Sequence, residues 1–158
     1  MDLSHRKTIL RKISTGLYIV TGMTHDGPTG AVISFLTQTS MDPPLITLAM
    51  RADSSIYSAA KKGNTLAIHF PSRDQQDMVA SFFKIKKIDE NLINGYRYSL
   101  NERNIPLLDD SPMILEVIVK EIVPEGDHHI FITEVTNTIL REDSDILSMH
   151  HTNWHYGG

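Results

Sequence analysis

The two longest β-branched runs of the sequence constrain its fold more than any other feature. Residues 113–123 and 130–136 are rich in Ile, Val and Thr, and the turn signal Pro124-Glu125-Gly126-Asp127 lies between them. This pattern predicts a long β-hairpin. A chain of 158 residues is short enough to share one hydrophobic core, so we expect a single domain over residues 1–158 that includes this hairpin.

The remaining segments predict shorter strands and a few helices. The pair Pro43-Pro44 must lie between two strands, because proline cannot donate to a strand ladder. We expect strands at residues 17–21, 30–36, 45–50, 65–70 and 96–99, helices at 5–13, 54–62 and 74–93, and otherwise irregular structure over 94–111. Neither a βαβ alternation nor a glycine-rich dinucleotide turn is present, so the pattern favours a mainly β barrel over a Rossmann sheet.

Composition excludes several classes of function. The sequence has no cysteine, which excludes disulfides, thiolate nucleophiles and Cys-ligated zinc or iron; redox chemistry would need a bound organic cofactor or a partner. The net charge is -4 and the basic clusters are short, so we expect no nucleic-acid partner. No apolar run is long enough to cross a bilayer and the N-terminus lacks a secretory signal, so we expect no membrane partner and a cytoplasmic location.

A polar cluster interrupts the apolar pattern between residues 30 and 45. Its members are Ser34, Thr37, Gln38, Thr39 and Ser40. A core strand would alternate strictly, so the cluster indicates either a binding site or an edge strand with a solvated face. The residues alone favour both interpretations equally.

A second candidate group follows the strand predicted at 45–50. Arg51 ends that strand, and Ser54 and Ser55 open the next helix. A guanidinium, two hydroxyls and the free N–H groups of a helix N-terminus can together bind one phosphate. The simpler interpretation is a surface arginine beside an N-cap serine, and the residues alone favour it.

Two motifs together resemble the flavin reductase family. Residues 30–45 carry, in order, a glycine, a polar strand and the diproline, as the family does, and residues 126–135 begin with Gly126-Asp127-His128 and continue as a strand. The resemblance implies a Greek-key split β-barrel with a few short flanking helices, which binds FMN, or FAD, and forms a homodimer. It also implies NADH or NADPH as electron donor.

The resemblance also implies a set of site residues. The expected cofactor-binding residues are Val32, Ile33, Ser34, Phe35, Thr37, Gln38, Thr39, Ser40, Arg51, Ser54 and Ser55. Two of them depart from the family pattern, because members often carry Thr where this chain has Val32 and a small polar residue where it has Phe35. Backbone groups would then take over part of the hydrogen bonding.

His128 is the expected catalytic residue. The resemblance places it beside the flavin and the entering nicotinamide, where it orients groups and stabilises charge, since hydride transfer needs no protein nucleophile. The expected activity is NAD(P)H-dependent reduction of FMN, with electrons passed to free flavin or to a partner redox protein. Two alternatives stay open, namely an FMN-carrying electron-transfer protein that does not react with nicotinamides, and a non-catalytic split-barrel binding module.

The C-terminal residues permit more than one interpretation. His150, His151 and His155 lie close together, but no Asp or Glu accompanies them, so we expect no metal site. Trp154 and Tyr156 could cover a flavin ring or a partner subunit, although simple packing is the commoner role of such aromatic residues.

Overall fold

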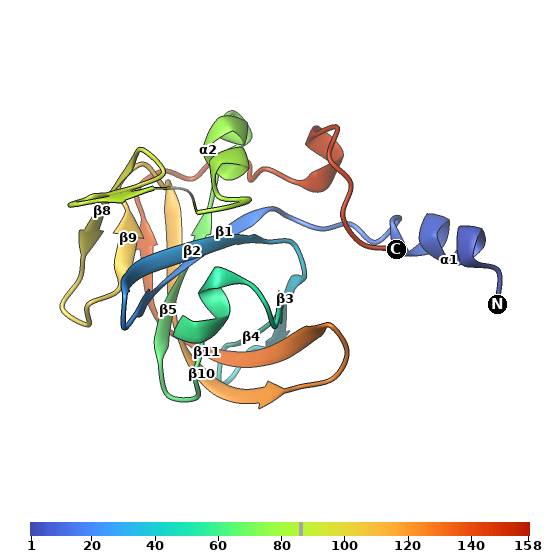
Figure 1. Ribbon diagram of the computed structural model, residues 1–158, viewed down its shortest axis with the longest axis horizontal. Helices are drawn as coiled ribbons and strands as arrows, with labels where there is room; N and C mark the ends of the chain where they lie inside the picture. Colours follow the sequence, from blue (N-terminus) through green and yellow to red (C-terminus); the bar gives the residue numbers. More distant parts are fainter. Residues whose placement is uncertain (86) are drawn as a thin grey trace.

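Seven antiparallel strands form the main sheet in a computed structural model that describes residues 1–85 and 87–158 (Figure 1). In sequence order they are β1 (Tyr18–Thr24), β2 (Gly27–Ile33), β3 (Leu36–Ser40), β4 (Leu45–Arg51), β5 (Thr65–Phe70), β10 (Met113–Val123) and β11 (His128–Leu140). Their order across the sheet is β2-β1-β5-β10-β11-β4-β3. The mainly β, split-barrel architecture with Greek-key crossovers is therefore confirmed.

The long hairpin predicted around residues 124–127 is the centre of this sheet. β10 pairs with β11 along almost its whole length, and two register shifts bend the pair, one with the extra residue Thr136 in β11 and one with the extra residue Lys120 in β10. β5 packs on one side of the hairpin and β4 on the other. Because β4 pairs with the first residues of β11, the ends of these two strands meet at one end of the barrel.

A second, smaller sheet lies beside the barrel, and it shows that the sequence-based expectations for residues 74–93 and 94–111 need correction. It consists of β6 (Ile88–Asp89), β7 (Leu92–Ile93), β8 (Tyr96–Leu100) and β9 (Pro106–Leu108). The helix expected at 74–93 was wrong, because only α2 (Gln76–Ser81) is helical and β6 and β7 follow it; residue 86 lies outside the described residues. The segment 94–111 is also more regular than expected, since β9 pairs with β8.

The other helices are short. α1 (Leu3–Leu10) extends away from the barrel and buries none of its residues, and Ile9 and Ile13 remain 67% and 63% exposed (Figure 1). The helix expected at 54–62 is the five-residue 3₁₀ helix η1 (Ser55–Ala59), and a second 3₁₀ turn, η2 (Met149–His151), lies near the C-terminus. In the described part of the chain no helix is long and apolar enough to cross a membrane.

Two apolar clusters stabilise the barrel. The first fills its interior between β1, β4, β5, β10 and β11 and includes the fully buried Met50 and Phe131. The second packs α2 and the small sheet onto the start of β1, with Phe82 at its centre. Phe82 also explains the glycine at position 30, because a Cβ atom there would lie 3.2 Å from two ring carbons of Phe82.

Candidate functional site

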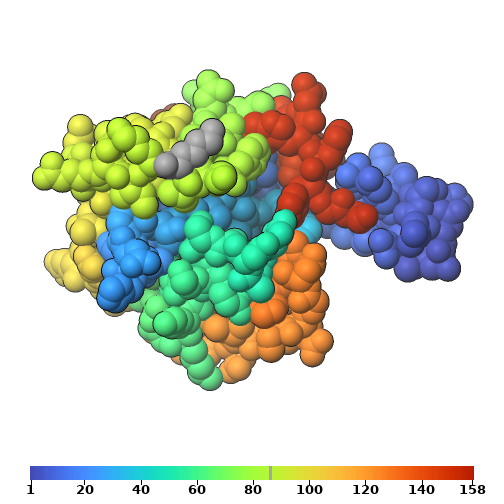
Figure 2. Space-filling model, in the orientation of Figure 1, coloured from blue at the N-terminus to red at the C-terminus, as the bar shows by residue number. Residues whose placement is uncertain are grey.

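A cavity of about 460 Å³ lies at the end of the barrel where β4 and β11 meet the C-terminal tail, residues 149–158. Figure 2 shows the tail, in red, passing over this part of the molecule between α2 and α1. A largely apolar wall and a few polar groups line the cavity. The lining residues are Leu17, Ala31, Val32, Ile33, Ser34, Phe35, Ala49, Arg51, Ser54, Phe83, His128, Met149, Trp154, His155 and Tyr156.

One wall of the cavity is the corner at which β2 turns into β3. The N–H of Leu36 donates to the carbonyl of Ser34 at 3.1 Å, and the N–H of Ala49 donates to the carbonyl of Phe35 at 2.9 Å, which ties the corner to β4. The corner therefore has a fixed backbone, and both apolar and polar side chains on it face the cavity. Four predicted residues, Val32, Ile33, Ser34 and Phe35, line the cavity here.

Arg51 supplies a cation at the same end of the barrel. Its Nε and Nη2 donate to the two carboxylate oxygens of Asp53 at 2.8 and 2.6 Å. This pairing raises the pKa of Arg51 and, through the hydrogen bond from the guanidinium, lowers the pKa of Asp53 below its usual range. A guanidinium has five N–H donors, so after the bonds to Asp53 it keeps donors for the Tyr156 hydroxyl, with which it also interacts, and for an acceptor in the cavity.

The two serines after Arg51 have different positions. Ser54 lines the cavity, and its hydroxyl donates to the carbonyl of Arg51 at 2.7 Å. Ser55 does not line the cavity, and its hydroxyl donates to the carbonyl of Gly30 at 3.2 Å. Ser55 therefore ties η1 to β2, and Ser54 is the serine that stands beside Arg51 in the cavity.

The polar residues of β3 lie outside the cavity lining. Thr37, Gln38 and Thr39 are exposed and Ser40 is half-buried. The hydroxyls of Thr39 and Thr47 are 2.9 Å apart, and the side-chain amide of Gln38 donates to the carbonyl of Ser40 at 3.1 Å. Because β3 is an edge strand, these four residues match the solvated-edge interpretation of the polar cluster.

His128 is the first residue of β11 and pairs with Arg51 across the ladder. Its Nδ1 lies 2.9 Å from a carboxylate oxygen of Asp127, and its Nε2 lies 2.7 Å from the hydroxyl oxygen of Tyr156. The Phe35 ring meets the imidazole edge to face, with centroids 5.4 Å apart. The side chain is 19% exposed, so contacts on several sides hold the ring at the cavity.

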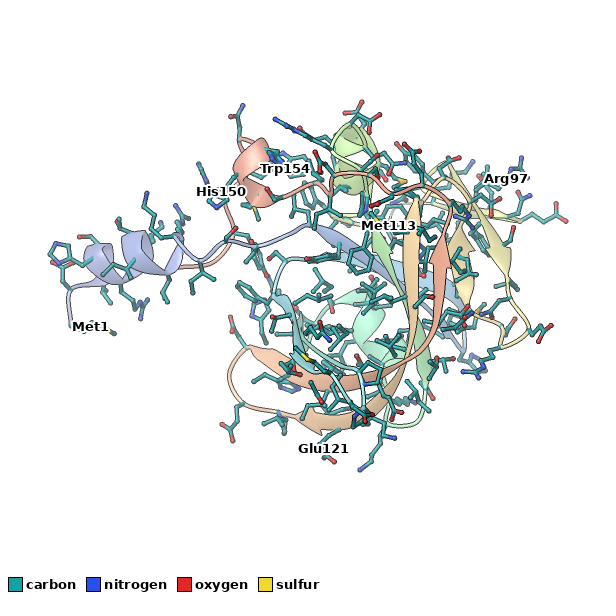
Figure 3. The ribbon with its side chains drawn as sticks, turned by 180° about the vertical axis from the view of Figure 1, so that it is seen from behind. Met1, Arg97, Met113, Glu121, His150 and Trp154 are labelled. Carbon is teal, nitrogen blue, oxygen red and sulfur yellow. The ribbon has the colours of Figure 1, made fainter. Side chains whose placement is uncertain are left out.

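The tail completes the cavity from the opposite side. The ring of Trp154 packs edge to face on Phe83 at 4.7 Å, and Tyr156 lies 5.6 Å from the Phe35 ring. Figure 3 shows Trp154 at this end of the molecule, far from Arg97. Arg11 donates from Nε to the carbonyl of Gly157 at 3.1 Å, which connects the tail to the end of α1.

Two acidic groups beside His128 have displaced titrations. The hydrogen bond from His128 and the charge of this imidazole lower the pKa of Asp127, so the carboxylate is ionised at neutral pH. Burial raises the pKa of Tyr156, while the nearby Arg51 acts in the opposite direction. The Tyr156 hydroxyl therefore keeps its proton at neutral pH.

The histidines do not gather into a metal centre. Among the residues that the structure describes, no group of three or more His, Cys, Asp or Glu side chains could hold a metal ion. His129 points to the opposite face of β11 from His128, where its Nδ1 lies 2.6 Å from the hydroxyl of Tyr57. His151 accepts at Nδ1 from the backbone N–H of Ser148 at 3.2 Å, within η2.

Several lining residues were absent from the sequence-based prediction. They are Leu17, Ala31, Ala49, Phe83, Met149 and His155, together with Trp154 and Tyr156, for which packing was the favoured interpretation. Ala31 lies next to the predicted Val32, and Ala49 lies two residues before the predicted Arg51 on the same strand, so both could have been found by extending the prediction along each strand. Phe83 and the tail come from distant parts of the chain, and no local pattern places them together.

Comparison with known proteins gives one family match and several similar sequences. A model of the family described as "Flavin reductase like domain" matches residues 10–158. An NADH:FMN oxidoreductase of Rhodococcus qingshengii is 27% identical over 139 residues, which cover 88% of this chain and 71% of that protein. The FMN reductase (NADH) SmoA of Agrobacterium fabrum is 26% identical over 136 residues, covering 86% of this chain and 76% of that protein.

A solved structure supports the fold independently. The flavin reductase domain protein from Arthrobacter sp. FB24 matches with a TM-score of 0.80 at 21% identity, covering 94% of this chain and 91% of that chain. At this identity the match shows the shared fold alone. It confirms the split barrel that places the two ends of β4 and β11 together.

Proposed function

Because this chain belongs to the flavin reductase like domain family, we propose that it binds FMN in the cavity beside His128 and reduces it with NADH or NADPH. The reduced flavin passes its electrons to free flavin or to a partner redox protein. One observation carries the proposal, namely that a single cavity brings together an apolar wall, the Arg51 guanidinium and the His128 imidazole.

The residues present fit a flavin nucleotide. Such a ligand needs an apolar surface for its ring, hydrogen-bond donors at the polar edge of the ring, and a cation or hydroxyls at its phosphate. Val32, Ile33 and Phe35 supply apolar surface, and the remaining N–H donors of Arg51 beside Ser54 suit a phosphate. FAD carries the same ring and the same first phosphate, so it would use the same groups.

The chain's own residues bind and orient in this reaction. The flavin supplies the redox chemistry, because it takes up a hydride and a proton while the nicotinamide is oxidised. Arg51 holds the anionic end of the ligand, and the wall of Phe35 and Trp154 keeps water from the ring. His128, fixed between Asp127 and Tyr156, places a polar group at the edge of the cavity where charge changes.

The phosphate assignment is tested with Arg51→Gln. The variant should bind FMN about tenfold or more weakly than the native protein, because a hydrogen bond to a charged group contributes roughly 1.5–3 kcal/mol. Riboflavin, which lacks the phosphate, should bind both proteins alike in a fluorescence titration. Arg97→Gln is the matched control, since it removes the same charge from an exposed residue on β8, far from the tail (Figure 3). Equal losses for FMN and riboflavin would contradict the assignment.

The reaction itself is tested by anaerobic mixing with NADH or NADPH. The proposal expects the flavin absorbance to bleach as the nicotinamide is oxidised. A protein that retains FMN and bleaches only with dithionite would be the electron-transfer alternative. A protein that binds neither FMN nor FAD would be the non-catalytic module.

The same proposal includes a homodimer, the commonest closed assembly. Support comes from α1, which presents Leu3, Ile9 and Leu10 to solvent where a second copy could cover them. Sedimentation equilibrium should give twice the chain mass of 17.8 kDa, and a monomer at all concentrations would contradict this part of the proposal.

A further inference from the structure

Asp127, His128 and Tyr156 form one chain of hydrogen bonds whose direction can be worked out. The Asp127 carboxylate can only accept, so Nδ1 of His128 carries a proton and donates to it at 2.9 Å. In a neutral imidazole Nε2 is then an acceptor, and the Tyr156 hydroxyl donates to it at 2.7 Å. The sequence of groups therefore runs from the tyrosine proton through the imidazole to the carboxylate.

Protonation of His128 reverses one bond in this chain. In the imidazolium both ring nitrogens donate, so Nε2–H turns towards the Tyr156 oxygen and the tyrosine proton becomes free for another acceptor. Tyr156 lines the cavity, and that acceptor would belong to a ligand there. The hydroxyl and the imidazole consequently act as one unit.

The position of Tyr156 is set by contacts on two sides. Its ring packs on Phe35 and His128, with centroids 5.6 and 5.8 Å away, and the next residue, Gly157, is bound through its carbonyl to Arg11. A Cβ atom at Gly157 would approach the Phe35 ring to 3.3 Å, so glycine permits the close passage of the tail. These contacts therefore fix the position of the Tyr156 hydroxyl relative to the His128 ring.

We propose that Tyr156 is a positioning residue that, together with Asp127, holds His128 in the Nδ1–H tautomer and fixes its ring at the cavity. The part of this inference that concerns catalysis rests on the proposed function, which assigns His128 to the reacting end of the ligand. The role of Tyr156 is distinct from that of Asp127, because Asp127 is 94% exposed and an exposed carboxylate alone selects the tautomer weakly.

Other charged groups face the same imidazole. Arg51 lies opposite it on β4, pairs with Asp53 and also interacts with the Tyr156 hydroxyl. His155 lines the cavity one residue before Tyr156. Within the described part of the chain none of these side chains hydrogen-bonds Nε2, so Tyr156 is the partner that a substitution can remove selectively.

The first test reads the tautomer directly in the native chain without added ligand. Nitrogen-15 NMR of the imidazole rings, recorded at a pH where the His128 ring is neutral, should show a proton on Nδ1 and an unprotonated, hydrogen-bonded Nε2. Tyr156→Phe keeps the ring and removes the hydroxyl, and it should give a mixture of both tautomers. Tyr96→Phe, at a half-buried tyrosine outside the cavity, should leave the His128 signals unchanged. The proposal would be overturned if His128 in Tyr156→Phe were still entirely in the Nδ1–H tautomer and its Nε2 chemical shift were the same as in the native protein.

The second test separates positioning from binding. With saturating FMN and NADH, Tyr156→Phe should lower kcat roughly two- to tenfold, the range that one hydrogen bond supplies, while the Kd for FMN stays within about twofold. Tyr96→Phe should match the native protein in both. Weaker FMN binding at unchanged kcat would overturn the proposal, because Tyr156 would then be part of the cavity wall alone. If the native protein neither binds FMN nor oxidises NADH, the proposed function fails while the NMR result still decides the tautomer.

Discussion

His69 makes the stability of the barrel dependent on pH, because its imidazole is buried without charge. The residue lies on β5, between Ile19 of β1 and Ile114 of β10, and it is 0% exposed. Thr21 donates its only hydroxyl proton to the carbonyl of Pro106, so its oxygen accepts from Nε2–H of His69 at 3.0 Å. Nδ1 is then the unprotonated nitrogen, and it has no partner among the described residues.

The size of the effect follows from the pKa of this histidine. Burial, aided by the charge of Arg141, lowers the pKa of His69 from 6.5 to about 3. Below pH 6.5 His69 binds a proton in the unfolded chain but stays unprotonated in the folded chain. The free energy of unfolding therefore has its full value above that pH and falls as the pH drops towards 3. Each pH unit within this window costs about 1.4 kcal/mol, which amounts to about 2 kcal/mol between pH 7 and pH 5.

Urea unfolding of the flavin-free protein, followed by far-UV circular dichroism, measures this loss without contributions from ligand binding. In His69→Gln the amide can still donate to Thr21 but does not titrate, so the decrease in unfolding free energy from pH 7 to pH 5 should be about 2 kcal/mol smaller than in the native protein. His25→Gln is the matched control, because the His25 side chain is fully exposed. Parallel pH profiles for His69→Gln and the native protein would refute the reasoning.

Three further substitutions test the packing by urea unfolding at pH 7. Phe82→Ala removes a side chain that is 1% exposed and should cost about 3–5 kcal/mol; a loss under 1 kcal/mol would show that the second cluster is not packed as described. Gly22→Ala should cost about 1–3 kcal/mol, because the new Cβ would lie 2.7 Å from a Leu66 methyl carbon, and an unchanged midpoint would contradict that contact. Lys62→Ala breaks an exposed pair with Glu121 at 3.0 Å and should cost less than about 1 kcal/mol, so a larger loss would reveal a role beyond the ion pair.

The strands were predictable where a β-branched, apolar composition is bounded by glycine or proline. β5 has the predicted bounds, because a run of β-branched and apolar residues lies between Gly63 and Pro71. β10 likewise begins directly after Pro112 and ends before Pro124. β5 is buried on both faces, and β10 buries Ile114, Val117 and Val119 while Lys120 and Glu121 near its end are exposed. In both strands tertiary packing and local preference favour the same structure.

In the expected helix over 74–93, by contrast, local sequence preference and the observed structure agree only at the start. Met78, Val79 and Phe82 have helical spacing and pack into the second cluster, but the helix ends at Ser81. Asn94 and Gly95 have φ values of 52° and 89°, which form a two-residue hairpin turn between β7 and β8. An Asn-Gly pair is a strong hairpin signal, so this part of the error was avoidable from the sequence.

The site was predictable in part, for a physical reason. Val32 to Phe35, Arg51, Ser54 and His128 lie in local motifs, and the fold brings them to one cavity. Thr37 to Ser40 were included because polarity in a strand looks the same for a ligand face and for a solvated edge, and only the sheet order separates the two. For Trp154 and Tyr156 a position over a flavin ring was one of the interpretations, and Phe83 was not predicted, since these contacts depend on how far the second cluster and the tail reach over the barrel.

The C-terminal part of the chain is attached to the rest of the protein first by backbone hydrogen bonds and then by side-chain contacts. The segment attached by side chains is the more weakly held side of the cavity. Up to Met149 the chain is tied to the barrel by backbone bonds, such as those from Leu147 to Pro71 and from Met149 to Thr15. Beyond Thr152 the described contacts to the barrel and to α1 are ring packing and single side-chain hydrogen bonds. Segments with few buried contacts open at the lowest free energy, whereas the corner at Ser34 is fixed in the sheet. A ligand in the cavity would therefore lie between the backbone-bonded corner of the barrel on one side and, on the other, a tail held by side-chain contacts such as that between Tyr156 and His128.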